Sequence, residues 1–155
     1  MKNRPGPAGA LESLRKYCAY QERCHQEVRS RLLSLGIFGD TLEEAMATLI
    51  EEGFLNEMRF AAAFARGKFR MKGWGKRKII HALHRKAVPE SCIKAALGEI
   101  EEQDYENTLE VILRRQLEDS VHLSVFEQRA LATRYALSRG YEANLIGKLL
   151  DKDLA

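Results

Sequence analysis

Apolar residues recur along most of the chain at the three- and four-residue spacing that places them on one face of a helix. Four stretches carry this spacing: Leu42, Met46, Leu49 and Ile50; Phe60, Ala63, Phe64 and Gly67; Ile79, Ile80 and Leu83; and Ile93, Ala96, Leu97 and Ile100. We find no sustained alternation of period two and no Asn-Gly or Asp-Gly hairpin turn. The pattern predicts an all-α protein with helices of about 10 to 17 residues.

Several residue types mark expected helix ends. Thr41 and Glu44 are spaced as a capping box, and Pro89 suits a first-turn position. Three glycines follow apolar helical runs, where a left-handed residue commonly ends the helix: Gly36, Gly53 and Gly140.

The helical pattern has an internal period of about 50 residues. When Gly36, Ala87 and Gly140 are placed in register, apolar residues coincide four positions before and six and ten positions after them: Leu32, Leu83 and Ala136; Leu42, Ile93 and Ile146; and Met46, Leu97 and Leu150. The match rests on apolar character and little on identity. It suggests three units of three helices each.

Composition places the chain among folded proteins, with 155 residues, 45% of them hydrophobic and 30% charged. The first ten residues have no apolar signal-peptide core, and no later window approaches a membrane span. Cys18, Cys24 and Cys92 are odd in number and irregularly spaced, so we expect three free thiols. These features favour a cytoplasmic protein.

Charge is strongly segregated, although the net charge is only +3. Nine Lys or Arg and no Asp or Glu lie between Arg66 and Lys86, whereas eight Asp or Glu lie between Glu99 and Asp119. Such a local excess of cations favours an anionic partner over a merely solvated surface. The candidate binding residues are Arg66, Lys68, Arg70, Lys72, Trp74, Lys76, Arg77 and Lys78.

The same segment contains two glycines and two aromatic residues. Gly73 and Gly75 are expected to let the backbone approach a partner closely. The side chains of Phe69 and Trp74 suit either stacking on nucleic-acid bases or filling a junction between helices, and the sequence leaves both open. We interpret the acidic segment around Glu99–Glu110 and a sparser arginine set as solvated faces; the latter comprises Arg114, Arg115, Arg129, Arg134 and Arg139.

Enzymatic alternatives lack their residues. A phosphate-binding P-loop around Gly75-Lys76 would need a glycine and a Ser or Thr where the chain has Arg70 and Arg77. No Cys-x-x-Cys or His-Glu-x-x-His spacing suggests a metal site, and no Gly-x-Ser-x-Gly elbow suggests a nucleophile. We therefore expect no catalytic centre, no cofactor and no metal.

The run from Glu51 to Ile79, EEGFLNExRFAxxFARxKFRxKGWGKxKI, followed by Leu83 and Lys86, resembles the central signature of the RecX family. The upstream segments QERCHQEVR, from Gln21, and Leu32-x-x-x-Gly36 resemble its first repeat. Similarity extends over about residues 10 to 150 and is weakest in the last third. The chain departs from the family at Asn56 and Glu57, where aspartates are usual, and at Ala87, where glycine is usual.

The resemblance implies an elongated array of three tandem three-helix repeats, which we place at residues 10–53, 54–102 and 103–155, after a flexible tail at residues 1–9. It implies a monomeric, non-enzymatic regulator that lodges in RecA filaments on single-stranded DNA and inhibits the RecA ATPase and strand exchange. We expect little consequence from Asn56 and Glu57, but an altered turn at Ala87. The alternative is a stand-alone helical nucleic-acid-binding protein with a helix-turn-helix-like pair near residues 75–102.

Overall fold

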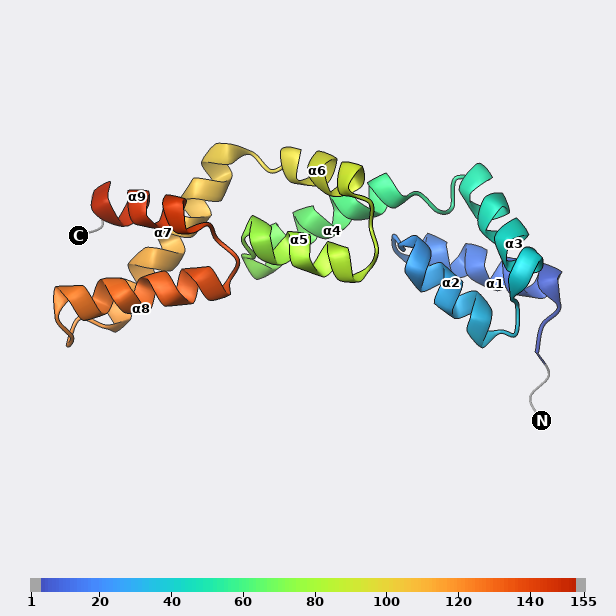
Figure 1. Cartoon of the computed structure of the whole chain (residues 1–155), viewed down its shortest axis with the longest axis horizontal. Coiled ribbons are helices and arrows are strands. Elements are labelled where there is room, and N and C mark those ends of the chain that lie inside the picture. Colours follow the sequence, from blue (N-terminus) through green and yellow to red (C-terminus); the bar gives the residue numbers. More distant parts are fainter. Residues whose placement is uncertain (1–3, 153–155) are drawn as a thin grey trace. The chain divides into compact units, whose positions relative to one another are not determined.

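The computed structural model describes residues 4–152, and every regular element among them is an α-helix (Figure 1). These helices range from 9 to 18 residues, which confirms the all-α prediction. None in this range is long and apolar enough to cross a membrane. They are α1 (Pro7–Tyr20), α2 (His25–Ser34), α3 (Gly39–Glu51), α4 (Glu57–Lys72), α5 (Lys76–Arg85), α6 (Glu90–Gly98), α7 (Glu102–Asp119), α8 (Val125–Ser138) and α9 (Ala143–Lys152).

The turn that follows the second helix of each triplet has the same geometry three times. Gly36, Ala87 and Gly140 all have positive φ, at 83°, 57° and 100°. In each turn the next amide donates to the carbonyl oxygen five residues earlier, as a Schellman motif requires: Ile37 to Leu32, Val88 to Leu83 and Tyr141 to Ala136. These bonds confirm the register found in the sequence. The expected change at Ala87 is wrong, because alanine adopts the left-handed conformation there and the turn is retained.

Two helix starts differ from the sequence prediction, and one agrees with it. The capping box at Thr41 is wrong: α3 begins at Gly39, because the carbonyl oxygen of Phe38 already accepts the amide of Leu42. Pro89 lies just before α6, where its carbonyl oxygen accepts the amide of Ile93, 3.1 Å away. Asn56 caps α4, since its Oδ1 accepts the amide of Arg59 at 2.9 Å, which agrees with the small consequence expected from this departure.

The first helix begins inside the segment predicted as a flexible tail, residues 1–9. Residues 1–3 of that segment lie outside the described residues. The helix α1 starts at Pro7, a residue type suited to the first helical position, and the Gly6 carbonyl oxygen accepts the amide of Ala10. The segment from residue 7 to 9 is therefore helical.

Helices α1, α2 and α3 contact one another around a shared apolar core. Leu14, Leu32 and Leu49 are fully buried there, and each such burial stabilises the fold by about 1.5–3 kcal/mol. Ile50 was predicted on the same face as Leu49 but is 45% exposed, because one residue along a helix rotates the side chain by roughly 100°. The three thiols are free, as expected, and the structure shows that all three are also buried: Cys18, Cys24 and Cys92.

The apolar face of α4 is displaced from the predicted one. Phe60 is buried as expected, but Ala63, Phe64 and Gly67 are only half-buried. The buried positions follow a four-residue spacing instead, at Ala61, Ala65 and Phe69. The apolar spacing in the sequence therefore predicted the helix but not which of its faces is buried.

Packing divides the chain into two compact units. One unit contains the described residues up to Phe64 together with Leu83–Ala95; the other contains Ala65–Ala82 together with the described residues from Ala96 onward. In the second unit, α7 contacts both α8 and α9, and Leu109, Leu113 and Ile146 are fully buried. The repeat boundaries 10–53, 54–102 and 103–155 stay a prediction, because the units follow core contacts and not the repeat period.

Candidate functional site

The basic segment lies entirely in the second unit, on the end of α4, the turn at residues 73–75 and the start of α5. Arg66, Arg70, Lys72 and Arg77 are exposed, whereas Lys68, Lys76 and Lys78 are half-buried. Ion pairs elsewhere in the described residues use other cations, so the four exposed residues have no carboxylate partner there. The cationic charge is therefore presented to solvent.

The two aromatic residues of this segment have different roles. Phe69 is 8% exposed and packs against the ring of Tyr105, with centroids 5.8 Å apart, so it fills the core. Trp74 is half-buried, with the Nζ atoms of Lys68 and Lys78 at 4.9 and 4.7 Å from its ring centroid. Each such cation–π contact is worth about 0.5–1 kcal/mol at an exposed site. The Trp74 ring is thus packed against cations of its own segment.

Residues 73–77 form what we call the basic turn. Its backbone is hydrogen-bonded to the turn between α8 and α9. The amide of Gly75 donates to the carbonyl oxygen of Arg139 at 2.7 Å, and the amide of Arg77 donates to that of Gly140 at 3.0 Å. In the other direction, the Tyr141 hydroxyl donates to the Gly73 carbonyl oxygen at 2.9 Å. The Arg139 guanidinium also donates to the last carbonyl oxygen of α4, on Lys72.

Gly75 allows the closest of these approaches. A Cβ at this position would lie 2.3 Å from the carbonyl carbon of Gly140, far inside any real contact. The sequence suggested that Gly73 and Gly75 let the backbone approach a partner. In the structure, the close approach at Gly75 is made to the chain's own Gly140 and Tyr141, whereas a Cβ at Gly73 would meet only the end of the Arg139 side chain.

A buried pair of tyrosines is hydrogen-bonded to the backbone of the turn. The rings of Tyr105 and Tyr141 lie 5.0 Å apart, and both residues are almost fully buried. The amide of Lys76 donates to the Tyr105 hydroxyl at 2.8 Å, and that hydroxyl donates to Oε1 of Glu142. Burial raises the pKa of both phenols well above the usual range, so both hydroxyls keep their protons near neutral pH.

These contacts determine how the turn can hold an anion. A helix N-terminus often binds phosphate through its free amides, but at the start of α5 the amides of Lys76 and Arg77 already have internal acceptors. These two amides are therefore not available to an anion, and the exposed side chains are the candidate anion contacts. Within residues 4–152, no group of three or more His, Cys, Asp or Glu gathers as metal ligands would.

The secondary charged segments are solvated only in part. Glu101, Glu102 and Asp104 are exposed around the start of α7, where acidic groups are favoured by the helix dipole. Of the second arginine set, Arg114, Arg115 and Arg134 are exposed. Arg129 pairs with Asp151, and Arg139 is the member that reaches the basic turn.

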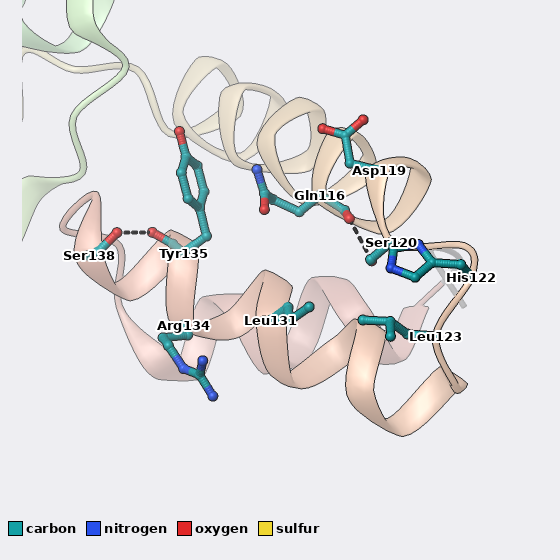
Figure 2. Close-up of a pocket in the computed structure, with 9 residues that line it drawn as sticks. All are labelled: Gln116, Asp119, Ser120, His122, Leu123, Leu131, Arg134, Tyr135 and Ser138. Atoms are coloured by element: carbon teal, nitrogen blue, oxygen red, sulfur yellow. Dashed lines mark hydrogen bonds between the residues drawn. The ribbon is translucent and has the colours of Figure 1, made fainter.

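Sequence reasoning missed two features of this unit. It did not connect Tyr105 and Tyr141 to the basic turn, although Gly140 had been singled out. It also missed an open hollow of about 470 Å³ between α7 and α8 (Figure 2). In this hollow the Ser120 hydroxyl donates to the carbonyl oxygen of Gln116, and the Ser138 hydroxyl donates to that of Tyr135.

Known proteins resemble this chain, and one match covers the region that contains the basic turn. Residues 56–97 match the family model described as "RecX, second three-helix domain". The chain is 32% identical to "Regulatory protein RecX" of Xanthomonas axonopodis pv. citri over 126 residues, which cover 81% of this chain and 76% of that protein. A second relative, from Lactobacillus gasseri, is 26% identical over 98% of this chain; the match spans only 56% of that longer protein. A third, from Prosthecochloris aestuarii, is matched over 60% of its length.

Solved structures agree on the fold. The crystal structure of RecX from Lactobacillus salivarius superposes with a TM-score of 0.88 at 19% identity, covering 94% of this chain and 95% of that one. Another crystal structure of a regulatory protein RecX gives 0.84 at 16% identity over 72% of its chain. With the signature at residues 51–79, the three matching turns and 32% identity over most of a RecX relative, this chain belongs to the RecX family.

Proposed function

We propose that this chain is a non-enzymatic regulator that binds RecA filaments assembled on single-stranded DNA and inhibits the RecA ATPase and strand exchange. The RecA partner comes from the family resemblance. In this proposal the chain acts as a monomer in the cytoplasm, and its three free thiols fit that reducing compartment. The basic turn contacts the filament through DNA phosphates or acidic groups of RecA.

The observation that carries the proposal is an exposed, uncompensated set of cations on a firmly held backbone. The side chains of Arg70, Lys72 and Arg77 are exposed and have no carboxylate partner in the described residues. Repulsion among them costs free energy in the isolated protein, and an anionic partner relieves that cost. Ordered cations also bind with less loss of side-chain and backbone freedom than disordered ones.

The inhibitory mechanism would be steric and electrostatic. A protein that occupies the groove of a RecA filament restrains the subunit movements that accompany ATP turnover. It also blocks access of the second DNA strand. No bond is made or broken by the regulator in this mechanism, so it needs no acid, base or metal of its own.

The test is the ATPase rate of the cognate RecA on single-stranded DNA, titrated with this protein. The variant carries Arg70→Glu, Lys72→Glu and Arg77→Glu, all at exposed positions. The control carries Lys16→Glu, Lys94→Glu and Lys152→Glu, which are also exposed and change the net charge equally. We expect inhibition by the wild type and the control, and half-inhibition by the variant only at about tenfold higher concentration or more. Circular dichroism checks that each protein is folded.

Two results would argue against the proposal. If the wild type leaves the ATPase unchanged yet binds DNA in a salt-sensitive manner, the chain is instead a stand-alone nucleic-acid-binding protein. If both triple variants inhibit as well as the wild type, the basic turn is not the contact.

A further inference from the structure

The α8–α9 turn, Arg139–Glu142, lies more than sixty residues from the basic turn in sequence, yet supplies most of the backbone partners that the basic turn has outside α4 and α5. Three backbone groups of the basic turn are bonded by this segment, on Gly73, Gly75 and Arg77. The Arg139 guanidinium adds a fourth contact at the end of α4. These bonds tie the turn to a segment outside the two helices that it joins.

The bonds fix the direction of the helix ends that display the cations. Arg70 and Lys72 occupy the last turn of α4, and Arg77 the first turn of α5. Their relative placement depends on the backbone of residues 73–75. Two charges on separate flexible segments bind adjacent phosphates poorly, because each contact must order its own segment.

We propose that the α8–α9 turn positions the basic turn to bind the phosphates of single-stranded DNA, with the Tyr141 hydroxyl as its main positioning group. This inference rests on the proposed function for its ligand, and commits the basic turn to DNA instead of RecA. Tyr141 touches no phosphate: its ring is buried, and its hydroxyl donates to Gly73. We expect no specificity for base identity, because Trp74 is packed against Lys68 and Lys78 and cations contact the phosphate backbone.

The chain offers a matched pair of substitutions. Tyr141→Phe removes one hydroxyl, with the bond to Gly73, and retains the ring, the charge and every cation. Tyr135→Phe is the control in the same unit: Tyr135 is 40% exposed, and its hydroxyl has no hydrogen-bond partner among residues 4–152. In Figure 2 the Tyr135 ring extends away from Ser138, and the dashed line from the Ser138 hydroxyl ends on the backbone oxygen of Tyr135.

Two measurements report on the basic turn. Binding to a fluorescently labelled oligo(dT) strand, without RecA, measures the phosphate contacts. Emission and acrylamide quenching of Trp74 report the conformation of the turn itself, since it is the only tryptophan in the sequence. We expect Tyr141→Phe to weaken oligo(dT) binding by about three- to tenfold and to increase quenching, while Tyr135→Phe matches the wild type.

The outcomes separate the inference from the proposed function. Unchanged oligo(dT) affinity in Tyr141→Phe, with increased Trp74 quenching, would overturn the positioning role. Inhibition of RecA by a wild type that does not bind oligo(dT) would overturn the commitment to DNA and leave the proposed function intact. Oligo(dT) binding with the expected Tyr141 effect but no RecA inhibition would support the inference and overturn the proposed function.

Discussion

At the scale of single residues, Gly75 shows how a sequence feature was placed correctly but interpreted differently from its structural role. A glycine in a basic turn is typical of close approach to an anionic ligand, and Gly75 is indeed at a point of close approach. The neighbour, however, is the backbone of Gly140. The sequence indicates that a residue without a side chain is needed at Gly75, whereas only the tertiary structure shows that the backbone of Gly140 lies against it.

This contact makes a testable prediction about stability. Gly75→Ala forces a Cβ against backbone atoms that cannot rotate away, so we expect a loss of about 1–3 kcal/mol in the free energy of unfolding. Gly67→Ala is the control: it lies in α4, where a Cβ meets nothing within 4 Å, and alanine should stabilise the helix by about 0.5–1 kcal/mol. Urea denaturation measures both. Equal effects of the two substitutions would contradict the close-approach argument.

At the scale of elements, local pattern predicted the helices well and their buried faces less well. Helix-forming spacing and the left-handed turns at Gly36, Gly53 and Gly140 are local properties, and all three glycines have positive φ as expected. No capping box forms at Thr41, because α3 begins earlier, at Gly39, and the carbonyl oxygen of Phe38 accepts the amide of Leu42. The buried face of α4 includes Ala61 and Ala65, because burial depends on tertiary packing and not on the helical period alone.

Ala87 gives the prediction at this scale. Its φ of 57° is unfavourable for any residue with a Cβ, and its side chain is exposed, so Ala87→Gly should stabilise the chain by about 0.5–1 kcal/mol. The control, Ala47→Gly, replaces an exposed alanine inside α3 and should destabilise it by about 1 kcal/mol. Thermal unfolding distinguishes the two, because opposite signs are expected. A lower melting temperature for both would show that the turn at Ala87 carries no strain.

At the scale of the whole molecule, the distribution of charge matters more than its sum. A net charge of +3 predicts weak attraction to nucleic acid, yet Arg66–Lys86 contains nine cations and no acid. The structure leaves Arg70, Lys72 and Arg77 exposed at one turn. Binding to single-stranded DNA should therefore depend on this turn and not on cations spread over other helices.

The salt dependence of DNA binding tests that expectation. Each phosphate contact on a single strand contributes about −0.7 to the slope of log K against log salt concentration, so Arg70→Gln, Lys72→Gln and Arg77→Gln together should reduce its magnitude by about 2. The same replacement at Lys16, Lys94 and Lys152, also exposed, should leave the slope unchanged. Fluorescence titration at several salt concentrations gives both values. Equal reductions in the two proteins would mean that net charge alone drives binding.

The sequence by itself determined the helical class, the repeated turns, the segregation of charge and the resemblance to RecX. The helical class, each single turn and the charge segregation depend on residues a few positions apart or on composition, and the repeat and the resemblance depend on the order of residues along the chain. None of them requires knowing what the chain packs against. Only the tertiary structure decided that Gly75 meets Gly140, that Phe69 fills the core and that Tyr141 bonds Gly73. These contacts join positions far apart in sequence, and no helical period or motif records which distant backbone a turn will meet.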